Sequence, residues 1–442
     1  MRRIVEAQLA AWAARSSRPL LILGARQVGK TYSVRQFGAE HFEQVAYANF
    51  QTDLTRLGRI FDGTLDPRRI VDDLSLVLGL TITPEDTLIV FDEVQLCQAA
   101  LTSLKYFAEE APQYRIIATG SQFGATVHRD PRYSFPVGKV DIVTMYPLTF
   151  EEFCWATGHD TWPNAIRGCL QDDRPLLIHD DVMRVYRQYL MCGGMPAVVS
   201  AFAQTANWSV VREMQADLVT LYAADARIYL PSTDAVRTQS IWRSAPNQLA
   251  RENRKFKLAD VAQGARSAQY EPGFAWLEDA GLIQRHRLVE TATAPLRFRE
   301  DGTFFKVYLL DVGLLSQAMG VRPDVYLDAE GRRTIASGFR GGLTENAIKQ
   351  ALVAQNMDSG YWTSGNTAEI DFLVVDDHLR VVPIEVKSSA NVRSKSLTEY
   401  VRRFQPPLAI RLADKNFGRE DILRSVPLYA GFCLRQAVSS AG

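Results

Sequence analysis

Residues 19–37 read "PLLILGARQVGKTYSVRQF". In this stretch an apolar run, Leu20 to Leu23, leads directly into the pattern G-x-x-x-x-G-K-T, and a segment compatible with a helix follows. A strand, a glycine-rich turn and a helix in this order predict a phosphate-binding P-loop. Gly24 and Gly29 let the backbone turn its N–H groups toward phosphate oxygens, and the N-terminus of the helix adds a favourable dipole. The stretch therefore predicts an α/β domain that binds a nucleotide.

The polar side chains of this loop have separate expected roles. Lys30 would reach the β- and γ-phosphates, and Thr31 would bind Mg²⁺ through its hydroxyl. The expected cofactors are ATP and Mg²⁺. The residues expected to contact the nucleotide are Gly24, Ala25, Arg26, Gln27, Val28, Gly29, Lys30, Thr31 and Tyr32.

A second nucleotide signal follows about sixty residues later, in "TLIVFDEVQ" at residues 87–95. Four apolar residues end in Asp92 and Glu93, and two carboxylates at the tip of a buried strand are costly unless they act there. Asp92 would hold Mg²⁺, and Glu93 would orient and deprotonate the attacking water. The alternative is a strand followed by an acidic helix cap.

Two further features of the nucleotide domain come from the next strand and the loop after it. In "YRIIATGSQ", residues 114–122, Ser121 would sense the γ-phosphate, with Thr119 as the alternative. Arg129 and Arg132 follow and could act in trans as an arginine finger on a neighbouring subunit of a homo-oligomer, the alternative being a solvated loop.

The expected strands of this region alternate with helical stretches. This alternation predicts a parallel sheet covered on both faces, with the ligand at the carboxyl ends of the strands. The strands are expected at residues 19–23, 44–50, 87–92, 115–120 and 140–146.

Composition sets the broad class of the protein. A chain of 442 residues, 47% apolar and 23% charged, exceeds one ordinary core and predicts several globular domains. The five cysteines form no C-x-x-C pair, so neither a zinc site nor a disulfide framework is indicated. The N-terminus predicts an amphipathic helix rather than a signal peptide, and we expect a cytoplasmic protein that does not contact a membrane.

The net charge is zero, but the charges are segregated along the chain. Residues 53–93 hold nine acidic and four basic side chains. Residues 237–257 hold six basic and one acidic, and residues 380–424 hold ten basic and five acidic. A polyanion such as DNA or RNA would therefore meet the later regions.

The middle of the chain predicts two modules without catalytic chemistry. Residues 151–235 have helical spacing and are expected to form a helical lid, with one helix ending at Gly193. Residues 236–312 predict a short helix, a second helix ending at Gly281 and two β-type segments, which is the order of a winged helix. Winged helices bind either DNA or proteins, and acidic residues in the second helix make DNA contact the lesser hypothesis.

The stretch "AEIDFLVVDDHLRVVPIEVKSS", residues 368–389, predicts a β-hairpin. Alternation places Glu385 and Lys387 on one face of a strand, and Asp371 lies on the partner strand. Glu345, on a preceding helix, has the spacing of an inward-facing residue. Three carboxylates could hold one or two Mg²⁺ ions while Lys387 activates water, and the alternative is a solvent-facing strand.

Taken together, six motifs resemble those of a prokaryotic family of AAA+-related P-loop ATPases with a C-terminal restriction-endonuclease-like domain of the PD-(D/E)XK type. These motifs are "GARQVGKT", "LIVFDEVQ", "ATGSQ", "VGKVDIVTMYPLTFEEF", "KVYLLDVGLL" and "AEIDFLVV…VPIEVKSS". Two positions depart from the family pattern: Ile370 rather than proline precedes Asp371, and Lys139 stands where relatives tend to carry arginine.

The resemblance implies an α/β chain with four parts: an ATPase domain at residues 1–150, a helical subdomain at 151–235, a winged helix at 236–312 and a nuclease-like domain at 313–442. It implies the additional-strand, catalytic-glutamate class of ATPase. The catalytic residues would be Lys30, Glu93, Ser121 and Lys387, and the metal ligands Thr31, Asp92, Glu345, Asp371 and Glu385.

Three functions follow from these expectations. The first is a Mg²⁺-dependent ATPase coupled to a nuclease module that processes nucleic acid. The second is an ATP-driven switch or scaffold whose C-terminal fold only binds a partner. The third is an ATPase that remodels proteins.

Overall fold

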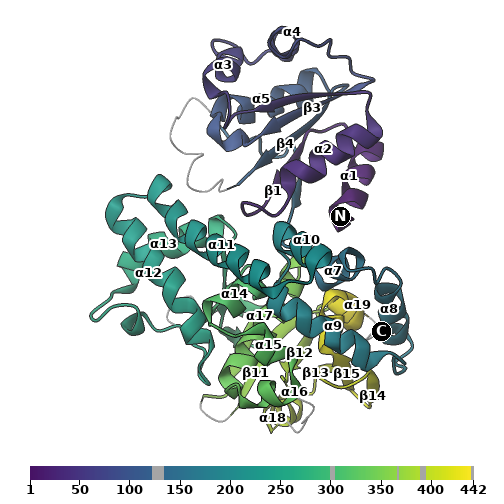
Figure 1. The fold of residues 1–442 in the computed structure, drawn as a ribbon, viewed down its shortest axis with the longest axis vertical. Coiled ribbons are helices and arrows are strands. Elements are labelled where there is room, and N and C mark those ends of the chain that lie inside the picture. Colours follow the sequence, from purple (N-terminus) through teal and green to yellow (C-terminus); the bar gives the residue numbers. More distant parts are fainter. Residues whose placement is uncertain (122–133, 299–303, 366–367, 389–394, 440–442) are drawn as a thin grey trace. The chain divides into compact units, whose positions relative to one another are not determined.

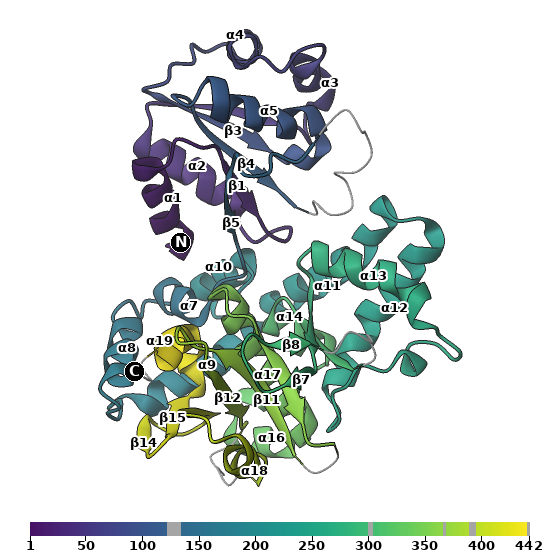
Figure 2. The ribbon, with the colours of Figure 1, turned by 180° about the vertical axis from the view of Figure 1, so that it is seen from behind.

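The computed structural model describes residues 1–121, 134–298, 304–365, 368–388 and 395–439. The chain divides into two compact units (Figures 1 and 2). The N-terminal unit comprises Arg2–Tyr146 with Asp279–Gly281, and the C-terminal unit comprises Pro147–Glu278 and Leu282–Gly442 with Met1. Each unit is described by itself below.

The N-terminal unit is built on a five-stranded parallel sheet in the order β2-β3-β4-β1-β5. The predicted strands are confirmed to within two residues at each end. The additional strand β4 separates the strand before the P-loop, β1, from the strand that ends in the two carboxylates, β3. The strands are β1 (Leu20–Leu23), β2 (Gln44–Asn49), β3 (Thr87–Asp92), β4 (Arg115–Gly120) and β5 (Asp141–Thr144).

Helices cover both faces of this sheet, as the continuous apolar runs predict. Alternate residues such as Ile89 and Ala46 point toward α3, α4 and α5, where the main core of the unit lies. The neighbouring residues Leu88 and Val45 face α2, and Gly38 of α2 lets the helix approach them closely, because a Cβ there would lie 2.7 Å from Val45. The helical elements are α1 (Ile4–Arg15), α2 (Lys30–His41), α3 (Leu54–Gly58), η1 (Arg59–Phe61), α4 (Pro67–Leu78), η2 (Val94–Leu96) and α5 (Gln98–Glu110).

The C-terminal unit begins with helices, as predicted for the middle of the chain. The side chains of Val182, Val185, Tyr186 and Tyr189 are buried on one face of α9, and the helix ends before Gly193. The helices are α7 (Phe150–Ala156), α8 (Trp162–Gln171), α9 (His179–Cys192), α10 (Pro196–Thr205), α11 (Trp208–Tyr229) and α12 (Ser232–Leu249).

The segment expected to form a winged helix contains most of α12, the helix α13 and two antiparallel strand pairs. One pair joins β6 to β9 and the other joins β7 to β8, and α13 ends just before Gly281 as predicted. The expected short first helix is reduced to one 3-10 turn, η3. Identification of this segment as a winged helix stays a prediction. Its elements are η3 (Leu258–Asp260), α13 (Ser267–Asp279), β6 (Ile283–Arg287), β7 (Val289–Thr291), β8 (Arg297–Phe298) and β9 (Phe305–Leu309).

The last part of the chain forms a six-stranded mixed sheet in the order β10-β11-β12-β13-β15-β14. The predicted hairpin is confirmed, since β11 and β12 are antiparallel and Asp376 caps the turn between them by accepting from His378 N and Arg380 N. The next strand, β13, runs parallel to β12. The strands are β10 (Gly360–Thr363), β11 (Glu369–Val375), β12 (Val381–Val386), β13 (Ala409–Ala413), β14 (Gly418–Glu420) and β15 (Leu423–Pro427).

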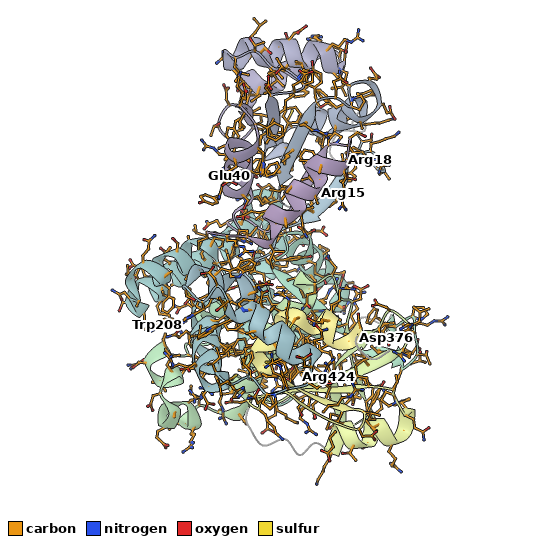
Figure 3. All side chains as sticks on the ribbon, turned by 90° about the vertical axis from the view of Figure 1, so that its right-hand side faces the viewer. Arg15, Arg18, Glu40, Trp208, Asp376 and Arg424 are labelled. Atoms are coloured by element: carbon orange, nitrogen blue, oxygen red, sulfur yellow. The ribbon has the colours of Figure 1, made fainter. Side chains whose placement is uncertain are left out.

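Helices enclose this sheet, and α17 precedes β10. Glu345, Ile348 and Leu352 of α17 are buried, which confirms the predicted inward face. Arg424 of β15, labelled in Figure 3, is 1% exposed and donates to Asp173 across 2.6 Å. The helical elements are α14 (Val312–Ala318), α15 (Pro323–Leu327), α16 (Ala329–Thr334), α17 (Ser337–Ala354), α18 (Lys395–Phe404), η4 (Leu428–Cys433) and α19 (Leu434–Ser439).

Two expectations from the sequence concern organisation. The boundary between the units falls between Tyr146 and Pro147, and the finer division into four domains stays a prediction. Among the helices described, none combines the length and apolar character that crossing a bilayer requires.

Candidate functional site

The P-loop connects β1 to α2 through a backbone that only certain residues tolerate. Gly24 has a φ of 149°, and a Cβ there would lie 2.3 Å from the carbonyl oxygen of Met145. Gly29 caps α2 with a φ of 96°. Gln27 also has a positive φ, 63°, which is uncommon for a residue other than glycine. The shape of the loop thus depends on its contact with the backbone at Met145 as well as on its own glycines.

Lys30 is the first residue of α2, and its ammonium group is buried within the loop. Its Nζ donates to the carbonyl oxygens of Gly24 and Ala25, both at 2.9 Å. Burial lowers the pKa of Lys30 to about 8, opposed by the attraction of Glu93 and Asp92. The amine therefore lies on the loop that would surround a phosphate, close to two carboxylates.

Asp92, 1% exposed at the end of β3, is the centre of a hydrogen-bond network. Thr31 Oγ1 donates to both carboxylate oxygens at 3.1 Å, and Asn49 Nδ2 donates to Oδ2 at 3.1 Å. The hydroxyls of Tyr47 and Thr119 donate to the same carboxylate. Burial and the bond to Asp92 raise the pKa of Tyr47 to about 12. A hydroxyl and a carboxylate held together at a P-loop suit Mg²⁺.

Glu93 follows directly and adopts a left-handed conformation with a φ of 55°. Its carboxylate accepts a hydrogen bond of 2.5 Å from the amide of Gln95. The same amide group approaches Ser121 Oγ at 3.4 Å, and Ser121 N donates to Gln95 Oε1 at 3.3 Å. The proposed base and the proposed sensor are therefore linked through Gln95, whereas the alternative sensor Thr119 binds Asp92.

Sequence reasoning missed several side chains that shape this site. Arg3, from α1's cap, donates to Val28 O at 2.9 Å and to Tyr146 O at 2.8 Å, so it braces the P-loop. Gln95 stood in the quoted motif, and its polarity beside a buried strand was the available signal. Tyr47 and Asn49 lie at the end of β2, the strand next to β3, and only strand pairing brings them to Asp92.

The remaining predicted residues of this region have varied exposure. Tyr32 is 59% exposed on α2. Lys139 forms an ion pair with Glu109 at 2.9 Å. Arg129 and Arg132, the proposed arginine fingers, lie outside the described residues. The roles of the predicted residues in catalysis and binding stay predictions.

In the C-terminal unit the hairpin brings three of the predicted residues together. Phe372 pairs with Ile384, and the next pair in this register places Asp371 opposite Glu385. Asp371 Oδ2 accepts from Val386 N at 2.8 Å, and Glu385 Oε1 lies 2.9 Å from Lys387 Nζ. Burial, followed by repulsion from Glu345, raises the pKa of Asp371 to about 8.

Glu345 is held by cations rather than lying open. Arg254 Nη1 donates to its Oε1 at 2.6 Å, Tyr308 donates to Oε2 at 2.9 Å, and Lys306 Nζ lies 3.4 Å from Oε2. Burial alone would raise the pKa of Glu345, but Lys306 and Arg254 outweigh it, and the pKa lies below the ordinary value. Lys306 also pairs with Glu369 at 2.7 Å. Within the described residues, no three His, Cys, Asp or Glu side chains form a group suited to hold a metal ion.

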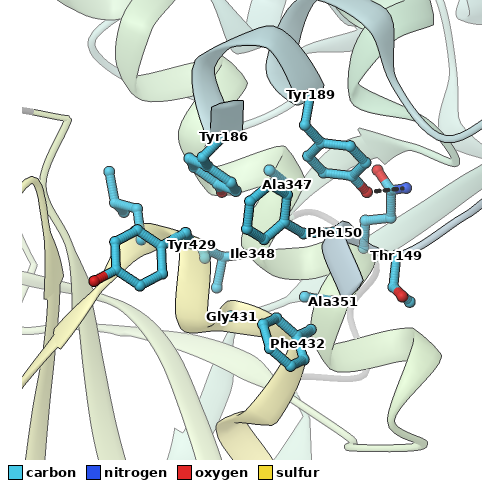
Figure 4. Close-up of a pocket in the computed structure, with 12 residues that line it drawn as sticks. Thr149, Phe150, Tyr186, Tyr189, Ala347, Ile348, Ala351, Tyr429, Gly431 and Phe432 are labelled. Atoms are coloured by element: carbon cyan, nitrogen blue, oxygen red, sulfur yellow. Dashed lines mark hydrogen bonds between the residues drawn. The ribbon is translucent and has the colours of Figure 1, made fainter. Parts of the chain in front are cut away.

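The C-terminal unit also contains a pocket between α7, α9, α17 and η4 (Figure 4). Its lining is mostly apolar, with the rings of Phe150, Tyr186 and Phe432 among the side chains. At the edge of the pocket, Gln350 Nε2 donates to the hydroxyl of Tyr189 across 3.2 Å, shown as the dashed line in Figure 4. Such a lining suits packing rather than the binding of a charged ligand.

Three family models match consecutive parts of the chain. An AAA domain matches residues 16–154, a domain of unknown function (DUF8612) matches residues 183–325, and a second domain of unknown function (DUF4143) matches residues 340–430. No curated protein matches the chain.

Three of the solved structures that match the chain come from different organisms. The Walker-type ATPase of Pyrococcus abyssi is 15% identical, with a TM-score of 0.42, over 72% of this chain and 95% of that chain. The ORC1 protein of Aeropyrum pernix, solved in complex with DNA, is 14% identical, with a TM-score of 0.33, over 73% and 94% of the two chains. PCH-2 of C. elegans is 15% identical, with a TM-score of 0.25, over 49% and 60%.

The match to the AAA family and the parallel sheet with its P-loop agree with each other. Residues 16–154 are therefore similar to AAA domains, and the N-terminal unit has the parallel sheet and P-loop that such a similarity leads one to expect.

Proposed function

We propose that the chain binds ATP with Mg²⁺ and hydrolyses it at the carboxyl ends of β1, β3 and β4. The observation that carries this proposal is the contact of Thr31 Oγ1 with both oxygens of Asp92 at 3.1 Å, at the first turn of α2. The hydroxyl and the carboxylate come from two separate motifs, and together they match the way P-loop enzymes hold a magnesium ion.

Each side chain has a role that its position supports. Lys30 binds the β- and γ-phosphates, and Glu93 orients the attacking water and accepts its proton. Ser121 senses the γ-phosphate and is connected to Glu93 through Gln95. Mg²⁺, held by Thr31 and Asp92, would neutralise the charge that develops on the phosphate oxygens.

Two substitutions test this mechanism. Lys30→Ala should abolish ATP binding, measured with a fluorescent ATP analogue, because it removes the cation that binds the phosphates. Glu93→Gln should retain ATP binding and lower turnover by about 10²-fold or more, because a general base contributes about 10²–10⁴ to the rate. Normal turnover in Glu93→Gln would refute the assignment of the base.

We further propose that the C-terminal unit carries a nuclease-like module that contacts DNA or RNA. The element order α17, β10, β11, β12, α18 and β13, with Asp371, Glu385 and Lys387 on the hairpin, supports this proposal. So does the basic excess of residues 380–424. Binding to a panel of single- and double-stranded DNA and RNA should weaken steeply as salt rises, because phosphate contacts release counterions.

A second candidate is an ATP-driven switch or protein-remodelling scaffold with a catalytically inactive C-terminal fold. The ion pairs of Glu345 with Arg254 and Lys306 favour this candidate, because they occupy a carboxylate expected to bind metal. An ATPase rate that is unaffected by nucleic acid and by salt would support the scaffold over the nucleic-acid role. A homo-oligomer is expected if an arginine acts in trans. Measuring the molecular mass of the Glu93→Gln protein in solution with ATP tests whether it forms such an oligomer.

A further inference from the structure

A buried lysine lies inside the acidic centre of the C-terminal unit. Lys306, on β9, is fully buried, and its Nζ lies 2.7 Å from Glu369 Oε1 and 3.4 Å from Glu345 Oε2. The ring of Tyr361 lies beneath it, with its centroid 5.3 Å from Nζ, so a cation–π contact adds to the two ion pairs. The ammonium group thus occupies a position that is surrounded by negative charge.

A second cation completes the neutralisation of this centre. Arg254 is 15% exposed in its side chain and donates to Glu345 Oε1 at 2.6 Å. A Cβ at Gly341 of α17 would lie 2.1 Å from Arg254 Nη2, so a larger residue there would make the guanidinium shift. The sequence of α17 therefore leaves space for this guanidinium directly beside the carboxylate.

The other acidic groups of the centre are also engaged. Glu385 pairs with Lys387, and Asp371 accepts a hydrogen bond from Val386 N. Each of the three carboxylates predicted to bind metal therefore has a cation or a backbone donor as its partner. The residues present do not fit a divalent metal ion. A metal ion bound to these carboxylates would displace the buried ammonium group of Lys306, and that ammonium group would then lack its counter-charge.

We propose that Lys306 and Arg254 are the resident cations of this acidic centre and take the place of a metal ion. They join the segment that carries Arg254 and β9 to α17 through Glu345 and to β11 of the hairpin through Glu369, so the centre holds these parts of the fold together. The proposal rests on the nuclease-like character proposed for the module and is independent of ATP hydrolysis.

Metal binding by the full-length chain tests the proposal. Every protein carries Asp92→Asn and is free of nucleotide, so that the ATPase site contributes no metal, and Mn²⁺ is titrated by calorimetry and by electron spin resonance. The chain with Lys306 intact should bind no Mn²⁺ in the C-terminal unit. Lys306→Met should gain one Mn²⁺ site, and adding Glu345→Gln should abolish it.

Lys349 provides a matched control, because it is a buried lysine of the same unit that donates to Ser359 rather than pairing with the acidic centre. Lys349→Met should gain no Mn²⁺ site, in contrast to the one site expected for Lys306→Met.

The outcomes separate cleanly. Binding of Mn²⁺ by the chain with Lys306 intact, lost on Asp371→Asn, would overturn the proposal. So would a folded Lys306→Met that gains no site. Should Lys306→Met fail to fold, the thermal midpoint of the chain with Lys306 intact decides. The proposal requires this midpoint to be the same in excess Mn²⁺ and in EDTA. A rise of the midpoint with Mn²⁺ that Glu345→Gln abolishes would refute the proposal. Loss of ATPase activity alone changes none of these measurements.

Discussion

The amide of Gln95 donates to the carboxylate of Glu93 across 2.5 Å and lies 3.4 Å from Ser121 Oγ. One side chain thus connects the proposed catalytic base to the strand that would detect the γ-phosphate. Glu93 is also in a left-handed backbone conformation, and this hydrogen bond holds its carboxylate beside Gln95.

Gln95→Ala should therefore lower kcat for ATP hydrolysis about tenfold, which is about 1.4 kcal/mol in the activation barrier, with little change in KM. The reason is that the base loses the group that orients it, while the phosphate-binding loop is untouched. Steady-state kinetics measure both constants. An unchanged or raised kcat would show that Gln95 does not help to position the base.

Tyr47→Phe should raise the Mg²⁺ concentration needed for half-maximal ATPase activity by about tenfold. The hydroxyl of Tyr47 orients the Asp92 carboxylate, and loss of an outer partner of a metal ligand typically costs 10–100-fold in affinity. A Mg²⁺ titration of the ATPase rate measures the shift. Tyr106→Phe, on α5, is the control and should leave the titration unchanged.

Lys349→Met should stabilise the C-terminal unit at neutral pH, and the gain should shrink as the pH rises. Burial lowers the pKa of Lys349 to about 8, and the attraction of Asp358 and Glu278 only partly opposes this effect. Between pH 8 and 10.5 the unfolded chain binds the proton that the folded chain has released, so this group makes the folded state more stable as pH rises through that window.

The difference between the pKa of Lys349 in the folded chain and its ordinary value corresponds to about 3 kcal/mol in the free energy of unfolding. Buried His286 also faces this lysine, and its own pKa is lowered well below the ordinary value by burial, so it stays neutral throughout the window. Thermal midpoints of both proteins at pH 7.5 and pH 10 test the prediction. Equal differences at the two pH values would contradict it.

Gly341→Ala should destabilise the chain by about 1–3 kcal/mol, although alanine normally favours a helix. The new Cβ would lie 2.1 Å from Arg254 Nη2 and would move the guanidinium off Glu345. Gly168→Ala, in α8, is the matched control, because the nearest atom to its Cβ lies at 3.9 Å, and it should be neutral or stabilising. Thermal unfolding compares the two variants, and similar effects at both positions would exclude the clash.

Much of the N-terminal fold follows from local sequence. The P-loop is contiguous, and the runs before Gly24 and Asp92 are long enough and apolar enough to predict strands buried on both faces. The hairpin could be predicted equally well from the sequence, because the turn at Asp376 separates two apolar strands. In each case the residues that give the signal lie within a few positions of one another along the chain, so their spacing alone is enough for the prediction.

The partners of the buried charges could not be predicted from local sequence. Gln95 was visible in its motif, but its contact with Ser121, 26 residues later, depends on β3 and β4 lying side by side. Likewise, Arg254 and Lys306 lie 91 and 39 residues from Glu345, in a segment with no apparent relation to the hairpin.

Local patterns of residues predict the P-loop, the strand ending in Asp92 and Glu93, and the hairpin carrying Asp371 and Glu385. The cations that neutralise the acidic groups become visible only in the folded chain. A carboxylate at a given spacing can face a metal ion, solvent or an ammonium group, and its energy depends on the charges within a few ångströms in space. Those distances are set by how distant segments pack, which the pattern of residues along the chain does not record.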